Sequence, residues 1–243
     1  MIIGAGGGIG QAFVELLMAQ DKCARVTALT RQPDSIALSG PKLHCGVLDI
    51  SDEASIEAAA LSLKEMTNTP EHKPAVLINC TGILHDKETG LQPERSHRHL
   101  SGDTMMQVFA VNTFGPALLV KYFLPLMPRD RRSIFASLSA RVGSISDNRI
   151  GGWYAYRASK AAHNMMLKTA SLEAAMRYKE LVVAGLHPGT VDTGLSAPFQ
   201  GNVTSDKLFT PKQSAGYLLE VLDGLTPAQS GRVFAWDGQE VPA

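Results

Sequence analysis

Tyr156 and Lys160 lie four residues apart within residues 154–178, a segment whose composition predicts a long helix. On a helix, side chains at this spacing share one face and lie one turn apart. A neighbouring ammonium group favours phenolate, so Lys160 is expected to lower the pKa of Tyr156 from about 10 toward neutrality. A phenol with such a pKa can exchange a proton with a substrate oxygen. The pair alone is weak evidence for chemistry, because the same spacing occurs by chance on many solvated helix faces.

A glycine-rich turn follows the first predicted strand, residues 1–3. Gly4, Gly8 and Gly10 lie where the chain must turn tightly and approach a phosphate closely, and both requirements favour a missing Cβ. A helix that begins near Gly8 would direct its unpaired N–H groups and positive dipole end at a pyrophosphate. The turn opens a βαβ unit and predicts a dinucleotide site. Only three residues precede Gly4, so we expect a short first strand, or one whose first residues the sequence lacks.

The residue after the second predicted strand, residues 25–30, indicates which dinucleotide binds. An NAD site would place Asp or Glu near the end of this strand to hold the ribose 2′-hydroxyl. Arg31 stands there instead, and the first acid is Asp34. The planar guanidinium of Arg31 can pair with a 2′-phosphate. A surface arginine in a turn would look the same, but the context favours NADP(H) over NAD(H).

Strands alternate with helices along the chain. Strands are predicted at residues 1–3, 25–30, 43–48, 75–79, 133–138, 181–186 and 232–235. Helices are predicted after the glycine turn, up to residue 66, from about 102 to 127, and at 154–178. This alternation predicts an α/β Rossmann-type fold, doubly wound, with a seven-stranded parallel sheet and helices on both faces. No repeat or linker divides the sequence, so residues 1–243 are expected to form a single domain.

Composition excludes several classes of protein. Lys plus Arg and Asp plus Glu both total 23, so no net charge attracts nucleic acid or an anionic membrane. Residues 108–127 are the most apolar stretch, but polar residues, a glycine and a proline interrupt it, which indicates a buried helix rather than a membrane span. The sequence shows no signal peptide, and the isolated cysteines suggest a reducing compartment, so a cytoplasmic protein is expected. The histidines of the polar loop lack a ligand pattern, so no metal site is expected: His85, His97 and His99.

Several motifs occur together in the order and rough spacing typical of one family. They are Gly4-x-x-x-Gly8-Ile9-Gly10, Asn79-Cys80-Thr81-Gly82, Asn112, Ser139, Tyr156-x-x-x-Lys160 and Pro188-Gly189-x-x-x-Thr193. This joint pattern spans nearly the whole chain and resembles the short-chain dehydrogenase/reductase family. The run from Gly151 to Lys160 resembles the carbonyl-reductase branch that includes Sniffer and the bacterial C-factor-like proteins.

The resemblance implies an oxidoreductase that uses NADP(H) to interconvert a carbonyl and an alcohol by hydride transfer. Tyr156 would be the general acid/base, and Lys160 would lower its pKa and hold the nicotinamide ribose hydroxyls. Ser139 would hydrogen-bond the substrate oxygen and stabilise its developing charge. Asn112 would hold a water molecule that relays protons from Lys160. A dinucleotide-binding regulatory or signalling protein on the same fold, with little or no turnover, is the alternative.

The serine is the least certain of these assignments. Family members usually have it about 13 residues before the tyrosine, whereas Ser139 lies 17 residues before Tyr156. Ser144, 12 residues before Tyr156, is the alternative. Ser139 is favoured because it follows a predicted strand directly, at the edge where open α/β sheets place their sites.

The resemblance also implies the remaining contacts. The cofactor would bind Gly4, Gly8, Ile9, Gly10, Arg31, Asp49, Ile50, Asn79, Gly82, Tyr156, Lys160, Pro188, Gly189, Val191 and Thr193. A small carbonyl or alcohol substrate would be bound by loops at about 84–101, 141–153 and 194–210. Apolar residues in these loops suggest a hydrophobic or aromatic substrate: Ile145, Ile150, Trp153, Leu195 and Phe199. Family members commonly form homodimers or homotetramers through their two long helices, and the same is expected here.

Overall fold

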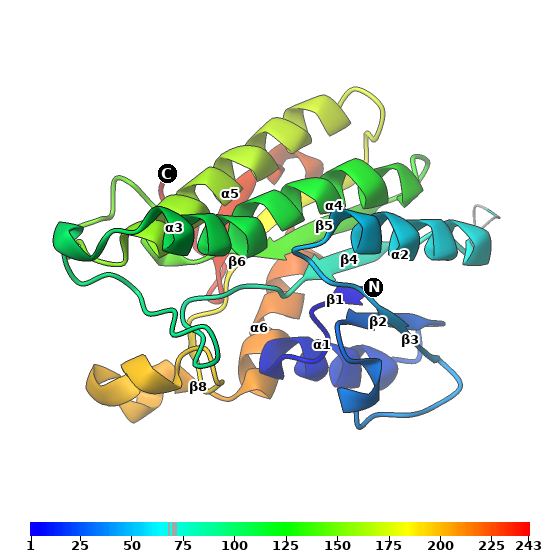
Figure 1. The fold of residues 1–243 in the computed structure, drawn as a ribbon. Coiled ribbons are helices and arrows are strands. Elements are labelled where there is room, and N and C mark those ends of the chain that lie inside the picture. Colours follow the sequence, from blue (N-terminus) through cyan, green and yellow to red (C-terminus); the bar gives the residue numbers. More distant parts are fainter. Residues whose placement is uncertain (68, 70–71) are drawn as a thin grey trace.

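The computed structural model describes residues 1–67, 69 and 72–243. Its centre is a seven-stranded parallel sheet in the order β3-β2-β1-β4-β5-β6-β9 (Figure 1). The strands are β1 (Ile2–Ile3), β2 (Val26–Thr30), β3 (Leu43–Val47), β4 (Val76–Asn79), β5 (Ser133–Leu138), β6 (Leu181–His187) and β9 (Arg232–Ala235). This is the predicted doubly wound sheet. The first strand is short, and its two residues pair with both β2 and β4.

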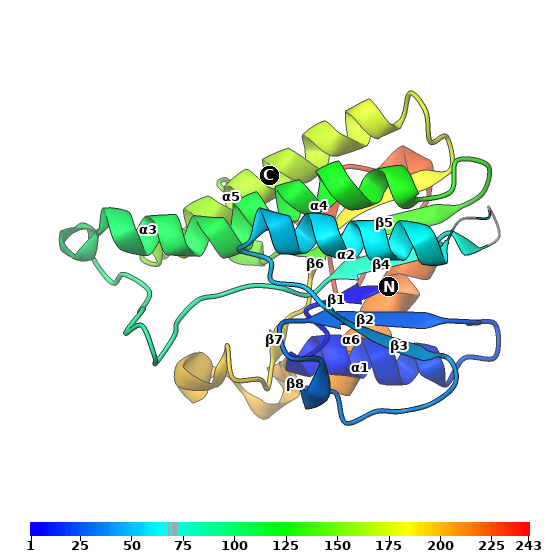
Figure 2. The same ribbon diagram turned by 45° about the vertical axis from the view of Figure 1, so that its right-hand side comes forward.

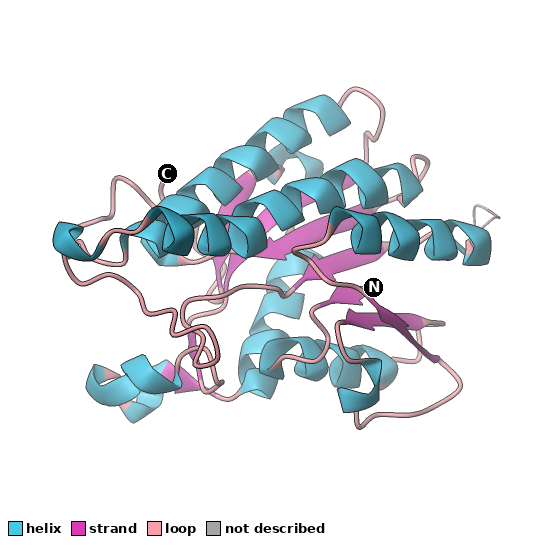
Figure 3. Ribbon diagram, in the orientation of Figure 1, coloured by secondary structure: helices cyan, strands magenta, loops and turns pink. Residues whose placement is uncertain are grey.

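Helices cover both faces of the sheet, as Figures 1 and 3 show. One face carries α1 (Gly8–Met18) and α6 (Pro211–Gly224), which bury Phe13 and Leu218 against it. The other carries α2 (Glu53–Met66), α4 (Gly115–Phe123) and α5 (Tyr154–Ala174), with Leu119 and Phe123 fully buried. The strand order reverses direction at β1 and β4, and in such sheets ligands bind at this point, outside the carboxyl ends of the strands.

Two helices differ from the sequence prediction. Helix α5 ends at Ala174 rather than at residue 178, because the chain turns there to enter β6. Helix α6 was not predicted at all. The residues at its start nevertheless indicate a helix: Pro211 is the first helical residue, and Thr210 and Gln213 form a reciprocal capping box.

The predicted helix near residues 102–127 is continuous but irregular. It consists of α3 (Gly102–Phe109), a π-helical turn at Ala110–Phe114, α4, and a 3-10 turn at Leu124–Leu126. In the described part of the chain, Gly102–Leu126 is one helix whose length and composition would allow it to cross a membrane, which is weak evidence because core helices of soluble proteins pass the same test. Its inner side packs in the core through Leu119 and Phe123. Single π-turns inside α-helices are frequent at functional sites, and this one contains Asn112.

Three long connections lie at the carboxyl edge. Residues 84–101 join β4 to α3, residues 141–153 join β5 to α5, and residues 194–210 follow the short strand β7 (Thr190–Val191), which pairs with β8 (Leu208–Phe209). Figure 2 shows the first and the last of these connections on the same side of the molecule, beyond the ends of the strands. They are the segments predicted as substrate loops.

Candidate active site

The glycine-rich turn is shaped by close backbone contacts. Gly4 has a φ of 77°, a conformation that favours glycine. A Cβ on Gly10 would collide with the carbonyl oxygen of Gly4, so α1 can approach β1 only because this residue is glycine. A Cβ on Gly8 would lie 2.9 Å from Cγ2 of Thr193, which places the predicted Pro188–Thr193 contact segment against the start of α1. Ile9 packs on the core beside the turn.

A cavity of about 680 Å³ opens at this turn and runs along the carboxyl ends of β1, β2, β3 and β4. Its volume lies in the range typical of cofactor sites. Of the predicted cofactor contacts, it is lined by Gly4, Arg31, Asp49, Ile50 and Gly82, together with Gly6 and Gly7. The turn, the start of α1 and the cavity thus provide a cradle that fits a dinucleotide phosphate and its adenosine.

Arg31 and Asp49 line this cavity just after β2 and β3, where the adenosine was predicted to bind. Burial alone would raise the pKa of Asp49, but hydrogen bonds from Ser51 and the positive charge of Arg31 hold it below its ordinary value. Asp49 therefore remains ionised and partly offsets the charge of Arg31. An anion bound there would compete with Asp49 for the guanidinium.

The side chain of Asn79 bonds groups of the sheet and the turn after β4, and does not face the cavity. Its side chain donates to Ser137 Oγ at 2.9 Å and accepts from the backbone and hydroxyl of Thr81. It is 1% exposed and does not line the cavity. Asn79 therefore joins β4 to β5 and fixes the turn that leads to Gly82.

The loop after β6 is also held by packing. The Pro188 carbonyl accepts a hydrogen bond from Ser214 Oγ at 2.8 Å. Gly189 has a φ of 76°, and a Cβ there would lie 2.7 Å from the Phe209 ring. Val191 is buried where β7 pairs with β8. These predicted cofactor contacts are thus fixed in place beside the glycine turn, although they do not line the 680 Å³ cavity.

Tyr156 and Lys160 share the buried face of α5, as their spacing predicts. They are 9% and 3% exposed, and Lys160 Nζ lies 5.9 Å from the centre of the Tyr156 ring. Lys160 Nζ donates to the Leu138 carbonyl at the end of β5, at 2.9 Å. A Cβ on Gly82 would lie 3.6 Å from Lys160 Nζ, so the ammonium group is next to the wall of the dinucleotide cavity.

The pKa of Tyr156 is shifted upward, whereas the sequence predicted a downward shift. Burial raises it to about 12, and Lys160 does not lower it. The physical reason is that the phenol is dry while the ammonium is directed at Leu138. Burial also lowers the pKa of Lys160, to about 8, which weakens its charge further. In this state Tyr156 is a protonated phenol at neutral pH.

Asn112 connects three segments through its side chain. Its amide nitrogen donates to the Ile83 carbonyl at 2.8 Å and to Ser159 Oγ at 3.2 Å, and its oxygen accepts from the Ile83 N–H at 2.8 Å. Thr113, the next residue of the π-turn, donates to the Ser159 carbonyl at 2.9 Å. Both side-chain N–H groups of Asn112 are therefore used by protein groups, so the expected water would bind an oxygen of this residue, either Oδ1 or the backbone carbonyl.

The two candidate serines lie in different surroundings. Ser139 follows β5 directly and donates to Asn164 Oδ1 on α5 at 2.6 Å. Ser144 lies further along the loop, where its hydroxyl accepts from the Asp147 N–H and donates to Ala243. Within the described residues, neither hydroxyl bonds Tyr156. Ser139 directly follows Leu138, whose carbonyl accepts the hydrogen bond from Lys160, whereas Ser144 lies further along the loop.

The three substrate loops meet at Trp153, whose part in the site the sequence does not reveal. Its ring makes edge contacts with Tyr156 and Phe199, at centroid distances of 6.1 and 5.0 Å. Phe199 in turn contacts His85, whose Nε2 is 3.0 Å from the Gly194 carbonyl. Trp153 has a φ of 51°, and a left-handed non-glycine residue stores strain of about 1–3 kcal/mol.

Two further residues near Tyr156 were missed from the sequence. His163 lies one turn beyond Lys160 on α5 and is 1% exposed. Burial and the charge of Lys160 lower its pKa to about 3, so it is neutral. Glu94, from the loop 84–101, is 3% exposed and touches the start of α5. Neither residue has a local sequence signal, because their burial follows from the tertiary fold.

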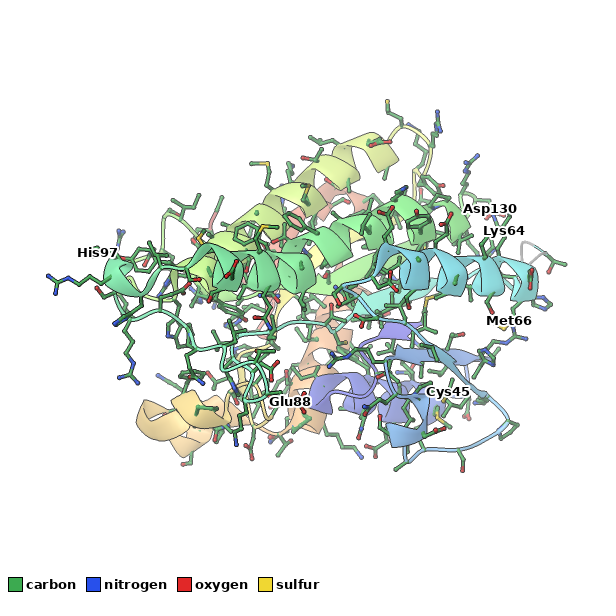
Figure 4. All side chains as sticks on the ribbon, in the orientation of Figure 1. Cys45, Lys64, Met66, Glu88, His97 and Asp130 are labelled. Atoms are coloured by element: carbon green, nitrogen blue, oxygen red, sulfur yellow. The ribbon has the colours of Figure 1, made fainter. Side chains whose placement is uncertain are left out.

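The remaining residues of the loop 84–101 spread outward. Figure 4 shows this segment extending from Glu88, near the middle of the view, to His97 at its far left edge. Among the described residues, no group of three or more His, Cys, Asp or Glu side chains is placed to hold a metal ion.

Comparison with known proteins identifies the family. A family model described as short chain dehydrogenase matches residues 1–203. The chain belongs to the short chain dehydrogenase family. It is accordingly an NAD(P)-dependent oxidoreductase that acts on a small molecule, and the cradle described above fits the dinucleotide that such enzymes use.

Three members of the family illustrate the range of its relatives. "C-signal" of Myxococcus xanthus is 36% identical over 138 residues, which cover 57% of this chain and 78% of that protein. "1-hydroxy-2-glutathionyl-2-methyl-3-butene dehydrogenase" of Rhodococcus sp. (strain AD45) is 30% identical over 238 residues, 98% of this chain and 96% of that one. The NADPH-bound carbonyl reductase from chicken fatty liver superposes with a TM-score of 0.85 at 28% identity, covering 100% of this chain and 98% of that one.

Proposed function

We propose that this short chain dehydrogenase uses NADP(H) to interconvert a carbonyl and an alcohol, with Tyr156 as the general acid/base. One observation carries the proposal: Tyr156 and Lys160 are buried on one face of α5, and Lys160 lies beside Gly82 in the wall of the dinucleotide cavity. When bound, the dinucleotide supplies or accepts the hydride. The residues of this chain orient the substrate and move the proton.

Tyr156 is suited to proton donation in the direction of reduction. With a pKa of about 12 its phenol is protonated at neutral pH, so it can give a proton to a carbonyl oxygen. In the reverse direction a positive charge close to the phenol would have to lower this pKa. Lys160 could supply it if its ammonium turned from the Leu138 carbonyl toward the phenol and the ribose hydroxyls.

Asn112 and Ser139 complete the proposed machinery. An oxygen of Asn112, either Oδ1 or the backbone carbonyl, would hold the water that returns a proton toward Lys160, because both side-chain N–H groups already donate to protein groups. Ser139 would release Asn164 to hydrogen-bond the substrate oxygen. Its position next to Leu138 supports this assignment over Ser144, which bonds Asp147 and Ala243 instead.

Arg31 would select NADP(H) by pairing with the 2′-phosphate. It lines the cavity at the end of β2, where an NAD site would carry an acid. The chicken carbonyl reductase, whose structure contains NADPH, supports this preference. Asp49 beside Arg31 makes the expected preference moderate rather than absolute.

The substrate would be a hydrophobic or aromatic carbonyl compound bound between the loops 84–101, 141–153 and 194–210. The rings of Trp153 and Phe199 form an aromatic wall at the place where these loops meet. The Rhodococcus relative is named for a glutathionyl alcohol, so carbonyl compounds with a bulky substituent belong in the test panel. We place the enzyme in the cytoplasm, in line with its isolated, free cysteines.

The enzyme would assemble through α4 and α5 into a homodimer or homotetramer. Large apolar side chains are exposed on α5 and just after it, and on α3 and the π-turn that lead into α4: Met106, Phe114, Met165, Leu172 and Met176. Exposed apolar patches of this kind mark protein interfaces. Light scattering in solution should give a mass of two or four chains, and a monomer at micromolar concentration would remove this part of the proposal.

Tyr156→Phe tests the proposed chemistry. NADPH oxidation is followed with a panel of aldehydes, ketones and quinones, and the loss of a general acid should lower kcat about 100- to 10,000-fold. NADPH affinity should change little, because the ring remains. Tyr154→Phe is the matched control, since Tyr154 is in the same helical turn but 40% exposed. If no panel member gives turnover that depends on Tyr156, the proposal fails.

The similarity to the protein named "C-signal" favours one other function, a dinucleotide-binding signalling protein with little or no turnover. Tight NADPH binding without turnover dependent on Tyr156 would support it. Turnover that Tyr156→Phe abolishes would count against it.

A further inference from the structure

Glu94 binds two backbone N–H groups that immediately precede Tyr156. Its carboxylate oxygen Oε2 accepts from the Ala155 N–H at 3.1 Å, and its backbone carbonyl accepts from the Trp153 N–H at 2.6 Å. The side chain is 3% exposed, and Oε1 has no hydrogen-bond partner among the described residues. Glu94 comes from the middle of the loop 84–101, so these bonds join a substrate loop to the first turn of α5.

Helix α5 lacks a cap of its own. Its N-cap residue, Trp153, makes no side-chain cap hydrogen bond, and its first turn contains no acidic residue. The first N–H groups of a helix need acceptors, and negative charge is favourable there because of the helix dipole. Glu94 supplies an acceptor from 61 residues away. In its place a local Ser, Thr, Asp or Asn would be usual.

The chain enters α5 in an unusual conformation. Gly151, Gly152 and Trp153 have φ values of 71°, 67° and 51°, three left-handed residues in succession. A non-glycine residue keeps such a conformation only where its surroundings impose it, and strain of this kind gathers at active sites. The Glu94 carbonyl is the acceptor for Trp153, and Arg157 Nε holds the Gly151 and Gly152 carbonyls at 3.2 and 3.0 Å.

Trp153 transmits this anchoring to the reactive phenol. Its ring lies edge-on to Tyr156, and its carbonyl accepts the first helical hydrogen bond, from the Arg157 N–H at 2.8 Å. Trp153, Glu94 and Phe199 also line a second cavity, of about 370 Å³, beside the loop 84–101. The anchor therefore lines a cavity between the predicted substrate loops.

We propose that Glu94 is a positioning residue for Tyr156: by capping α5 from the substrate loop it fixes Trp153 and the direction of the phenol. The proposal deepens the proposed carbonyl reduction and rests on it for its kinetic consequence. It requires the hydrogen bond from Ala155, which an amide oxygen can replace. It does not require contact between Glu94 and substrate.

The test compares Glu94→Ala with Glu94→Gln. Because a small misplacement of a reacting group can reduce turnover about 100-fold, we expect Glu94→Ala to lower kcat roughly 10- to 100-fold, with KM for NADPH unchanged. Glu94→Gln keeps an oxygen that can accept from Ala155 and should keep kcat within about threefold of wild type. Hydrogen exchange of the Ala155 amide should be about tenfold faster in Glu94→Ala only, as expected when one buried hydrogen bond is lost, while the Trp153 amide keeps its bond to the backbone carbonyl of residue 94.

Thr226→Ala is the control for a loss of stability alone. Thr226 caps a 3-10 turn at Pro227–Gln229, before the amino end of β9, so its removal should lower Tm without changing kcat. Equal kcat in Glu94→Ala and Thr226→Ala would overturn the proposal, and so would a Glu94→Gln variant as slow as Glu94→Ala. The exchange measurement needs no turnover. If wild type reduces no carbonyl, the proposed function fails, while unchanged exchange in Glu94→Ala would separately refute the anchor.

Discussion

The two ends of the active site are built in different ways. The dinucleotide end is made by backbone: a glycine turn between β1 and α1, whose side chains are absent so that main-chain atoms can approach each other. The catalytic end is made by side chains from distant segments: Asn112 holds Ile83 and Ser159, Ser139 holds Asn164, and Glu94 holds Ala155. The first depends on consecutive residues, and the second on the tertiary fold.

Because of this difference, the two ends should respond differently to substitution. A turn formed by consecutive residues needs little support from elsewhere, because its conformation follows from its glycines. The catalytic end depends on hydrogen bonds between residues 25 to 61 positions apart, so it changes when any of these partners moves. We therefore expect substitutions in the catalytic end to change stability and turnover together, and substitution of exposed side chains in the dinucleotide end to change binding alone.

Asn112→Ala should give the largest effect of this kind. It leaves the partly buried N–H and carbonyl of Ile83 without these partners, and each such group costs up to about 1–3 kcal/mol, so unfolding should be easier by roughly 2–5 kcal/mol. Turnover should fall as well, since the loop at Gly82 and the second turn of α5 lose their connection. Urea unfolding and kcat measure the two effects. Thr113→Val is the control: it removes a single hydrogen bond to the same Ser159 and should lower stability and kcat less. Equal losses in the two variants would contradict the role given to Asn112.

The buried Lys160 should make stability depend on pH. Burial lowers its pKa from 10.5 in the unfolded chain to about 8 in the folded protein, so between these values the unfolded chain binds more protons. Stability should therefore rise with pH across this window, by about 3 kcal/mol in total. Tyr156 has the opposite sign, because its raised pKa makes stability fall from pH 10 to about 12.

Unfolding of wild type and Lys160→Met, compared from pH 7.5 to 10, isolates the contribution of Lys160. The free energy of unfolding of wild type should rise relative to that of the variant. Parallel curves would mean that the ammonium is hydrated in the folded protein.

Arg31→Asp should give the smallest effect and leave stability unchanged, because the side chain is exposed. The ratio of NADPH to NADH affinity should fall about tenfold or somewhat more, as expected for the loss of a hydrogen bond to a charged group. Arg25→Asp, at the opposite end of β2, is the matched control. An unchanged ratio would contradict the role given to Arg31.

The sequence predicted the fold well and the catalytic end only in outline. The parallel sheet and the turn between β1 and α1 follow from local periodicity and from Gly4, Gly8 and Gly10, while the cofactor contacts stay predictions. A short first strand was one of two expectations. Helix α6 was missed although Thr210, Pro211 and Gln213 mark its start, so that omission was avoidable.

The errors in the catalytic end have a different origin. The pKa of Tyr156 was predicted to fall because spacing shows that Lys160 is near, but not that its ammonium is directed at Leu138. Asn112 was expected to hold a water molecule, and this stays a prediction; the sequence did not show that its side chain bonds protein groups. Glu94 gave no signal, because a capping residue distant in sequence leaves no local pattern. Such residues become visible only when the fold brings them together.

The left-handed run at Gly151, Gly152 and Trp153 has a practical consequence for engineering. It divides the loop 141–153 into a fixed hinge, joined to α5, and a crest where Ile145 and Ile150 are 79% and 91% exposed. Libraries that vary Ile145 and Ile150, and keep Asn148 to accept from the Gly151 N–H, are expected to alter substrate range while the phenol keeps its place. Libraries that randomise residues 151–153 would mostly yield inactive clones, because they remove the hinge along with the specificity they seek to change.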